Sequence, residues 1–379
     1  MYKDAMRAAW TEINLSNLDF NIKQIQQRVS PNTKITGIIK ADAYGHGAIK
    51  VASVLRANGI TSYGVATLAE AVRLRNAGFI LEDIVILGLT PQPLIDPIIQ
   101  HRLTPVVSSY ANAEAISDAA RHAGIIIKVN IAVDTGMGRI GFNPDDSTSI
   151  EDIKMIDKLP NIEIKGLVSQ FATSDETDKT YAAVQEQRYM VFYKKLLNAD
   201  VKIPVRTLAN SAAIIELSST HFEMVRPGDM LYGLYPSTEV DKRIVALRPV
   251  MSVKANIVEL KNVPTGTSIG FGRNYTASKD SIIATIPIGY SDGLHRAYAS
   301  KGQVIVNGVM APIAGTIGMD MTMIDVTHVP YVRLGDEVTI MGSDGVAEIT
   351  ADDIAAKLNT INNEVVCDFG MRLPKVYTY

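Results

Sequence analysis

The chain has 379 residues, of which 47% are hydrophobic and 20% are charged. That is enough apolar material to bury the cores of one large domain and one smaller domain. The 37 basic and 40 acidic residues leave a formal charge of −3, and no lysine and arginine cluster is interleaved with aromatic residues. This balance argues against a nucleic acid or a membrane surface as partner, so we expect a small-molecule partner.

The N-terminal stretch Met1-Tyr2-Lys3-Asp4 has no apolar core of signal-peptide length, and no segment approaches the roughly 18 apolar residues of a spanning helix. We therefore expect a cytoplasmic protein. The single cysteine, Cys367, cannot form an internal disulfide or a thiolate metal cluster. Its ordinary role would be core packing, with a reactive thiol as the alternative. No metal site is predicted.

From about residue 35 to residue 232, short β-branched runs alternate with longer helical patterns, which is typical of a parallel sheet with crossover helices. Eight strands are predicted, in the segments ITGIIKADA, SYGVAT, DIVILGL, TPVVSS, IIIKVNIAV, IEIKGLVSQF, VRTLAN and HFEMVRPGDML. Helical segments such as GAIKVASVLRANG and LAEAVRLRNAG lie between them. This pattern predicts an α/β fold, a (β/α)8 TIM-type barrel whose chemistry lies at the C-terminal ends of the strands.

The pattern changes after Tyr235. The segments SVKANIVELKNV, SIIATIPIG, GQVIVNGVMAPIAG and DEVTIMG read as strands separated by Gly and Pro turns, with one helix in TADDIAAKL. The sequence therefore predicts a barrel domain over residues 11–235. A mainly β C-terminal domain over residues 236–379 would also include residues 1–10.

Lys40 ends the first predicted barrel strand, within the stretch GIIKADAYGHG. A lysine there would be partly desolvated at the barrel mouth, where it could react with an aldehyde. Position alone also allows a lysine whose amine extends into solvent. The residues that follow it favour the first interpretation.

The chain resembles the alanine racemase family of fold-type III pyridoxal phosphate enzymes. The resemblance rests on six motifs in the family's order: IIKADAYGHG, VDTGMGRIG, LANSAA, MVRPGDMLYG, IPIGYSDG and GTIGMDMTMIDVT. It implies that pyridoxal 5'-phosphate is bound covalently to Lys40. It further implies a homodimer whose two active sites take residues from both subunits.

The phosphate of that cofactor would be held by several groups. Ser211 starts a predicted helix, where its hydroxyl and free backbone N–H groups can bind an anion, although an ordinary helix cap at Asn210 or Ser211 is the alternative. The resemblance adds the backbone N–H groups of Gly228 and Asp229 and the hydroxyl of Tyr44. Asp229 departs from the family, which has an apolar residue there, and we expect its carboxylate to point away from the phosphate.

The resemblance assigns three further residues. Arg226 would face the pyridine nitrogen, and because a guanidinium keeps its proton at neutral pH, the ring would be a weak electron sink. Arg139 would reach the phenolic oxygen of the cofactor and the substrate. Met319 lies in a segment that crosses the dimer interface in this family and offers backbone donors to the substrate carboxylate.

The sequence departs from the family at the second base. A two-base racemase needs an acid or base on each face of the cofactor, and the family's L-side tyrosine is here Phe271, which has no titratable proton. Four more family residues are replaced in this chain, at Gln170 and Thr207 (both histidine in the family), Ala132 (a lysine that is often carbamylated) and Asn363 (tyrosine).

The resemblance predicts an amino acid racemase that interconverts L- and D-alanine and supplies D-alanine for the cell wall. An enzyme with lysine as its only base, such as a D-amino acid aldolase or transaminase, is the alternative on the same scaffold. A pyridoxal phosphate-binding protein without turnover is a further alternative. If racemisation persists, Tyr275, a bound water or Lys40 alone would supply the second proton transfer.

Overall fold

The computed structural model describes residues 6–379, and contacts divide it into two compact units. One unit comprises Asp19–Ala43 and Ala48–Leu247, and the other comprises the described residues up to Leu18 together with Tyr44–Gly47 and Arg248–Tyr379. The domain limits at residues 235 and 236 stay a prediction. The stretch Met1–Asp4 and half of the segment 1–10 lie outside the described residues.

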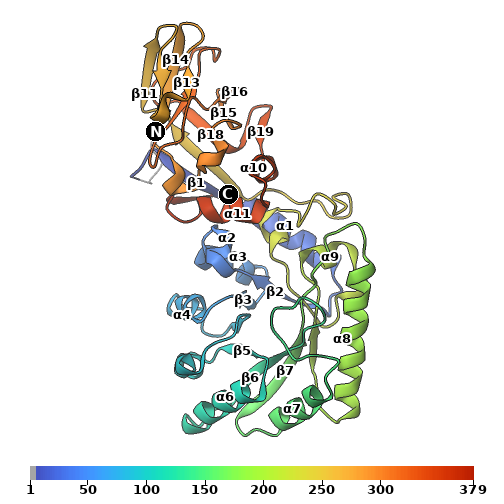
Figure 1. The fold of residues 1–379 in the computed structure, drawn as a ribbon. Coiled ribbons are helices and arrows are strands. Elements are labelled where there is room, and N and C mark those ends of the chain that lie inside the picture. Colours follow the sequence, from blue (N-terminus) through green and yellow to red (C-terminus); the bar gives the residue numbers. More distant parts are fainter. Residues whose placement is uncertain (1–5) are drawn as a thin grey trace. The chain divides into compact units, whose positions relative to one another are not determined.

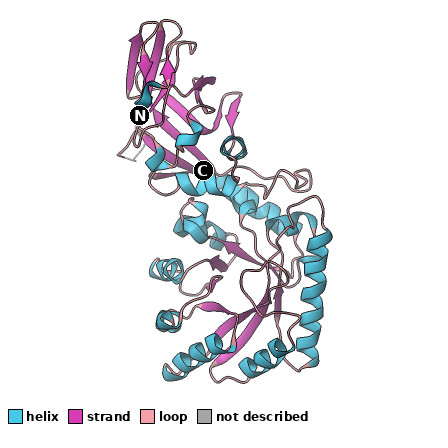
Figure 2. Cartoon of the chain, viewed as in Figure 1, coloured by secondary structure: helices cyan, strands magenta, loops and turns pink. Residues whose placement is uncertain are grey.

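The first unit is built around a closed barrel of eight parallel strands within the described chain, with helices on its outside (Figures 1 and 2). Its strands are β2 (Lys34–Ile38), β3 (Ser62–Val65), β4 (Asp83–Ile86), β5 (Thr104–Val107), β6 (Ile127–Ala132), β7 (Ile162–Val168), β8 (Val205–Thr207) and β9 (Met224–Val225). Seven fall within the predicted segments and β2 begins one residue before its segment, so the predicted (β/α)8 barrel is confirmed. The barrel closes where β2 pairs with β9, with Lys34 opposite Met224 and Ile35 opposite Val225.

The helical elements from α1 to η3 precede, connect or follow these strands. They are α1 (Leu15–Arg28), α2 (Lys40–Tyr44), α3 (Ala48–Ala57), α4 (Leu68–Asn76), η1 (Gln92–Leu94), α5 (Asp96–Gln100), α6 (Tyr110–His122), α7 (Ser147–Asp157), α8 (Thr180–Asn198), α9 (Ser211–Glu216), η2 (Ser218–Thr220) and η3 (Asp229–Tyr232). Buried apolar residues of the helices pack inward, as Val51, Ala52 and Leu55 do on α3.

The second unit is mainly β, as predicted. Its strands are β1 (Ala9–Asn14), β10 (Met251–Asn256), β11 (Glu259–Val263), β12 (Ser268–Ile269), β13 (Tyr275–Thr276), β14 (Ser281–Ile286), β15 (Gln303–Val306), β16 (Val309–Pro312), β17 (Thr322–Asp325), β18 (Glu337–Asp344), β19 (Ala347–Ile349) and β20 (Lys375–Thr378). Its helical elements are η4 (Phe271–Arg273), η5 (Tyr290–Asp292), η6 (Arg296–Tyr298), α10 (Ala351–Leu358) and α11 (Asn362–Phe369).

The two ends of the described chain meet in the larger sheet of this unit. The strand β1 pairs with β10 in the antiparallel sense and with β20 in the parallel sense, and Figure 1 shows it in blue among orange and red strands. Its residues Ala9, Trp10 and Ile13 are buried, so apolar burial fixes its register. No helix among residues 6–379 is long and apolar enough to cross a membrane.

Candidate active site

Lys40 follows the buried end of β2 and is half-buried. The end of β2 is tied to the segment after β9, because the Ile38 N–H donates to the Pro227 carbonyl at 2.9 Å. The Tyr232 hydroxyl donates to the Ile38 carbonyl at 2.7 Å. Pairing of β2 with β9 therefore places Lys40 and the Arg226–Asp229 segment at the same edge of the barrel.

The turn after Lys40 is left-handed. Ala41, Asp42, Ala43 and Tyr44 have φ values of 51°, 53°, 57° and 52°. Such a conformation costs roughly 1–2 kcal/mol for each residue with a Cβ, so surrounding contacts must hold the turn. Gly45 continues it at φ 79°, where a Cβ would lie only 2.6 Å from the Val366 carbonyl oxygen. Glycine is therefore required at position 45.

Arg226 is a buried cation with neutral partners. Its Nη1 donates to Thr207 Oγ1 at 2.6 Å, and its Nη2 donates to the Ser169 carbonyl at 2.5 Å and to Gln170 Oε1 at 3.2 Å. The Leu208 carbonyl accepts at 3.3 Å. Within residues 6–379, Nε has no acceptor, Nη1 has one acceptor for its two N–H groups, and no carboxylate pairs with the guanidinium, so the Nε–H and one Nη1–H are left for a ligand.

Burial lowers the pKa of Arg226 to about 10, and the nearby charge of Arg139 acts in the same direction. Arg226 therefore still carries its charge at neutral pH. Arg139 itself is exposed, on the loop after β6. This electrostatic coupling indicates that the two arginines lie near each other at the strand ends.

Ser211 begins α9, and its hydroxyl is buried. Ser211 Oγ accepts from the Gly228 N–H at 3.0 Å and from the Met230 N–H at 3.4 Å. Asn210 caps the helix, since its side chain accepts from the Ala213 N–H. The structure thus brings Ser211 and Gly228 together, as the sequence predicts, and assigns the cap to Asn210. Asp229 is half-buried at the start of η3.

The loop that carries Arg139 is held by the longest helix. Tyr181, Gln185 and Arg188 lie on one face of α8, at i, i+4 and i+7. Tyr181 donates to the Gly136 carbonyl at 2.9 Å, and Arg188 donates to the Thr135 carbonyl at 3.3 Å. Side-chain contacts from α8 therefore hold the segment before Arg139 against the barrel.

Gln185 is fully buried between two loops. Its Nε2 donates to Thr135 Oγ1 at 3.3 Å and to the Gln170 carbonyl at 3.0 Å, while its Oε1 accepts from the Ala172 N–H at 2.8 Å. Gln185 thus connects the loop that carries Arg139 to the loop after β7, where the Gln170 side chain accepts from Arg226. The sequence did not identify Gln185 as a site residue. An amide on the apolar face of the predicted helix was the signal that could have indicated its role.

The substituted positions have different surroundings. Gln170 and Thr207 both accept hydrogen bonds from Arg226. Ala132 packs in an apolar cluster with Val85 and Val106, against Leu87, Ile140 and Val168. Asn363 Oδ1 is buried and has no hydrogen-bond partner within residues 6–379.

In the second unit, Phe271 and Met319 are exposed, at 76% and 54%. The Phe271 carbonyl accepts from Thr316 Oγ1 at 3.0 Å, and the Met319 carbonyl accepts from Ser291 Oγ at 2.7 Å and from the Ser291 N–H at 3.1 Å. The loop of Met319 and the loop of Tyr290 are therefore bonded to each other.

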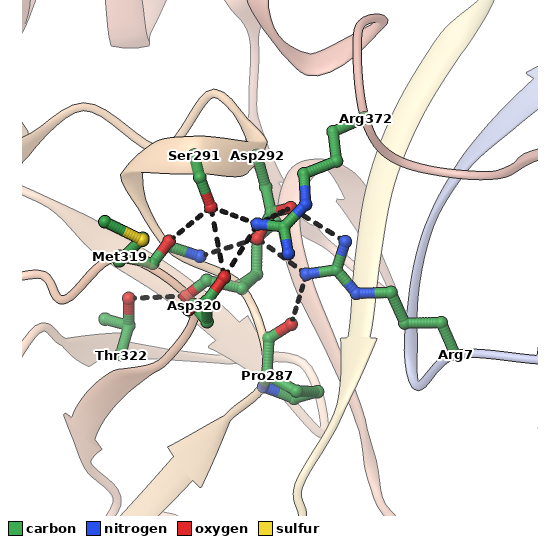
Figure 3. Close-up of polar contacts among 10 residues, drawn as sticks. Arg7, Pro287, Ser291, Asp292, Met319, Asp320, Thr322 and Arg372 are labelled. Atoms are coloured by element: carbon green, nitrogen blue, oxygen red, sulfur yellow. Dashed lines mark hydrogen bonds and ion pairs between the residues drawn. The ribbon is translucent and has the colours of Figure 1, made fainter.

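A charged cluster stabilises these loops (Figure 3). The fully buried Asp292 accepts from both terminal nitrogens of Arg7, at 2.7 and 2.6 Å. Arg372 lies 3.3 Å from Asp292 and donates to Asp320 at 2.7 Å and to Ser291 Oγ. Two arginines thus compensate the buried carboxylate, and Arg372 also joins Asp320, which follows Met319, to the loop of Ser291.

Comparison with known proteins agrees with this geometry. The model of the alanine racemase N-terminal domain matches residues 13–236, and that of the alanine racemase C-terminal domain matches residues 250–377. The chain belongs to the alanine racemase family. The resemblance inferred from the six motifs is thereby confirmed.

Individual members of the alanine racemase family match nearly the whole chain. Alanine racemase of Clostridium kluyveri is 47% identical over 98% of this chain and 94% of that protein. Alanine racemase 1 of Clostridium acetobutylicum is 48% identical over 98% of this chain and 96% of its own. The solved structure of alanine racemase from Clostridium difficile 630 has a TM-score of 0.94 and 39% identity, over 98% of this chain and 96% of that one.

Proposed function

We propose that this chain is a pyridoxal 5'-phosphate-dependent racemase that interconverts L- and D-alanine. The observation that carries the proposal is the pairing of β2 with β9, which brings Lys40 beside the segment of Arg226 and Gly228. Membership in the alanine racemase family supports the same chemistry. We further propose a cytoplasmic location, with which the single cysteine agrees.

The donors at the barrel edge suit a phosphorylated aldehyde. Lys40 would bind the aldehyde. Ser211 and the N–H groups of Gly228 and Asp229, with the hydroxyl of Tyr44, would hold the phosphate, the Gly228 N–H exchanging its bond to Ser211 Oγ for one to the anion. The free Nε donor of Arg226 suits the unprotonated ring nitrogen of such a cofactor, because a charged guanidinium donates without giving up its proton. When bound, the cofactor withdraws electrons from the substrate α-carbon and so acidifies its proton.

Lys40 would then remove and return the α-proton on one face of the substrate. Arg139 would orient the phenolic oxygen of the cofactor and the substrate carboxylate. Arg226 would keep the ring nitrogen unprotonated and so limit side reactions of the substrate. The backbone at Met319 would bind the carboxylate from the partner subunit.

We propose a homodimer with shared active sites. The exposed apolar side chains Phe271, Tyr290, Met319 and Met321 lie on loops of the second unit that are bonded to one another through Thr316, Ser291 and Gly318. A group of exposed apolar residues on rigid loops suits contact with a second copy of the chain.

A second candidate function is chemistry with Lys40 as the only base. It is favoured by Phe271, which has no proton to exchange, and by the neutral partners Gln170 and Thr207 on Arg226. Aldol cleavage or transamination of a D-amino acid would require a base on one face only. A binding protein without turnover would require none.

Paired measurements on both alanine enantiomers in heavy water separate these functions. A racemase exchanges the α-proton of both enantiomers and converts L- to D-alanine. An enzyme with lysine as its only base exchanges D-alanine far faster than L-alanine and does not interconvert them. Absence of exchange for both, in protein that carries the cofactor, would contradict both catalytic proposals.

A further inference from the structure

Glu70 joins the peptide after Lys40 to the neighbouring strand end. Its Oε1 accepts from the Ala41 N–H at 2.6 Å. Its Oε2 accepts from the Ala66 N–H at 2.8 Å and from the Thr67 N–H at 3.0 Å. One half-buried carboxylate thus connects the loops that follow β2 and β3.

The position of Glu70 on α4 makes it rigid. Thr67 is the N-cap of α4, and its Oγ1 accepts from the Glu70 N–H at 3.3 Å, which completes a capping box. A capping box by itself uses the glutamate only for the backbone of the cap. Here Oε1 of the same carboxylate also accepts from the Ala41 N–H, so Glu70 bonds to the turn after Lys40 as well as to its own helix cap.

A second contact from α4 supports the same turn. Arg73, one turn after Glu70, lies 3.4 Å from Asp42. Asp42 Oδ1 also accepts from the Ala48 N–H at 3.0 Å. Glu70 thus bonds to Ala41 and Arg73 contacts Asp42, and both of these turn residues have positive φ, a conformation that costs energy for residues with a Cβ.

We propose that Glu70 is a positioning residue for Lys40. By holding the Ala41 amide, it fixes the direction in which the lysine side chain leaves the barrel edge, while α4 supplies the rigid support. The inference rests on the proposed role of Lys40 as the residue that binds the cofactor. It assigns Glu70 no contact with cofactor or substrate.

The test compares Glu70→Gln and Glu70→Ala with Thr67→Ala. Glutamine keeps the size of the side chain, but its single oxygen cannot accept on both sides, and alanine removes both acceptors. Thr67→Ala weakens the same helix cap and leaves the bond to Ala41 in place. Each protein is incubated with pyridoxal 5'-phosphate and reduced with borohydride at timed intervals, and the pyridoxyl label on Lys40 is quantified by peptide mass mapping.

We expect the Lys40 label to form about tenfold more slowly in both Glu70 variants, the factor that corresponds to loss of one charge-assisted hydrogen bond. Amide exchange in the peptide 37–47 should be faster in the same two variants. Thr67→Ala should match the wild type in both measurements. These results would separate positioning of Lys40 from general support of the helix.

Wild-type labelling rates in the Glu70 variants would overturn the inference, as would equal slowing by Thr67→Ala. These outcomes leave the proposed function intact, because Lys40 is still labelled. If the wild type carries the label on another lysine, the proposed function fails first, and the inference fails with it.

Discussion

The hydroxyl of Tyr275 donates a hydrogen bond of 2.5 Å to Oδ2 of Asp325. Burial, this bond and the charge of Asp325 raise the pKa of Tyr275 to about 12. A phenol with that pKa stays protonated at neutral pH and is a poor base. The arrangement therefore argues against Tyr275 as the replacement for the tyrosine that is absent at Phe271.

For Tyr275, we predict that Asp325→Asn lowers its pKa, while burial keeps it above the ordinary value of 10. Because the folded state raises this pKa, the associated stability is complete below pH 10 and is lost as the pH rises towards 12. Ultraviolet titration of Asp325→Asn against the wild type, with Tyr275→Phe to identify the signal, measures the shift. An unchanged titration would show that the bond to Asp325 has no influence.

For Phe271, we predict that exchange of the α-proton is slower on the L side, and that L-to-D conversion persists at that slower rate. L-alanine should exchange about 10²- to 10⁴-fold more slowly than D-alanine, the usual contribution of a general base. Phe271→Tyr should raise L-to-D conversion only in part, because Gln170 and Thr207 remain in place of the family histidines. Equal, rapid exchange of both enantiomers in the wild type would show that another group acts on the L side.

For the dimer, we predict complementation between two inactive chains. In a hybrid of Lys40→Ala with Met319→Pro, one of the two shared sites has both intact residues. Mixed chains should therefore recover about a quarter of the wild-type activity, because half of the dimers are hybrids. The assay is racemase activity after co-refolding, with each variant alone as control. A fully active monomer would refute shared sites.

For Gln185, we predict that substitution loosens the loop that carries Arg139 and the loop of Gln170, whose side chain accepts from Arg226. Gln185→Leu leaves the Ala172 N–H and the Gln170 carbonyl without their partner, which should cost about 1–3 kcal/mol of stability. Amide exchange should accelerate in residues 133–141 and 169–173. The exposed Gln27→Leu is the control and should change stability by less than about 0.5 kcal/mol. Equal effects of the two substitutions would contradict the bridging role.

For the base of the barrel, we predict that Lys165→Met destabilises the protein in a pH-dependent way. Burial would raise the pKa of Asp83, but Lys165, Thr104 and Ser62 outweigh it and hold that pKa below its ordinary value. The resulting stability is present above pH 3.8 and is lost as the pH falls.

The expected loss for Lys165→Met at neutral pH is about 3 kcal/mol, because Asp83 would keep its charge without a cation. Thermal unfolding between pH 3 and pH 7 measures it. Arg121→Gln, which breaks the exposed pair with Asp118, is the control and should cost less than about 1 kcal/mol. A loss that does not shrink towards pH 3 would count against the electrostatic cause.

The sequence by itself determined the eight barrel strands, because each is a short apolar run between turn residues, and that signal is local. Its motifs also determined the family and the positions of Lys40, Ser211 and Arg226 at strand or helix ends. Tertiary structure decided which groups surround them. Arg226 takes its acceptors from Ser169, Gln170, Thr207 and Leu208, which only strand pairing brings together.

Tertiary structure also decided the left-handed turn after Lys40. Alanine and tyrosine disfavour positive φ, and aspartate adopts it only as a single residue, so the sequence around the lysine predicts no turn of four such residues. It persists because Glu70, twenty-nine residues later, accepts the Ala41 N–H, and because Asp42 bonds to the start of α3. Tertiary structure likewise decided the pairing of β1 with β20, two strands at opposite ends of the described chain. Burial of the apolar residues of β1, and not a local sequence pattern, selects that pairing.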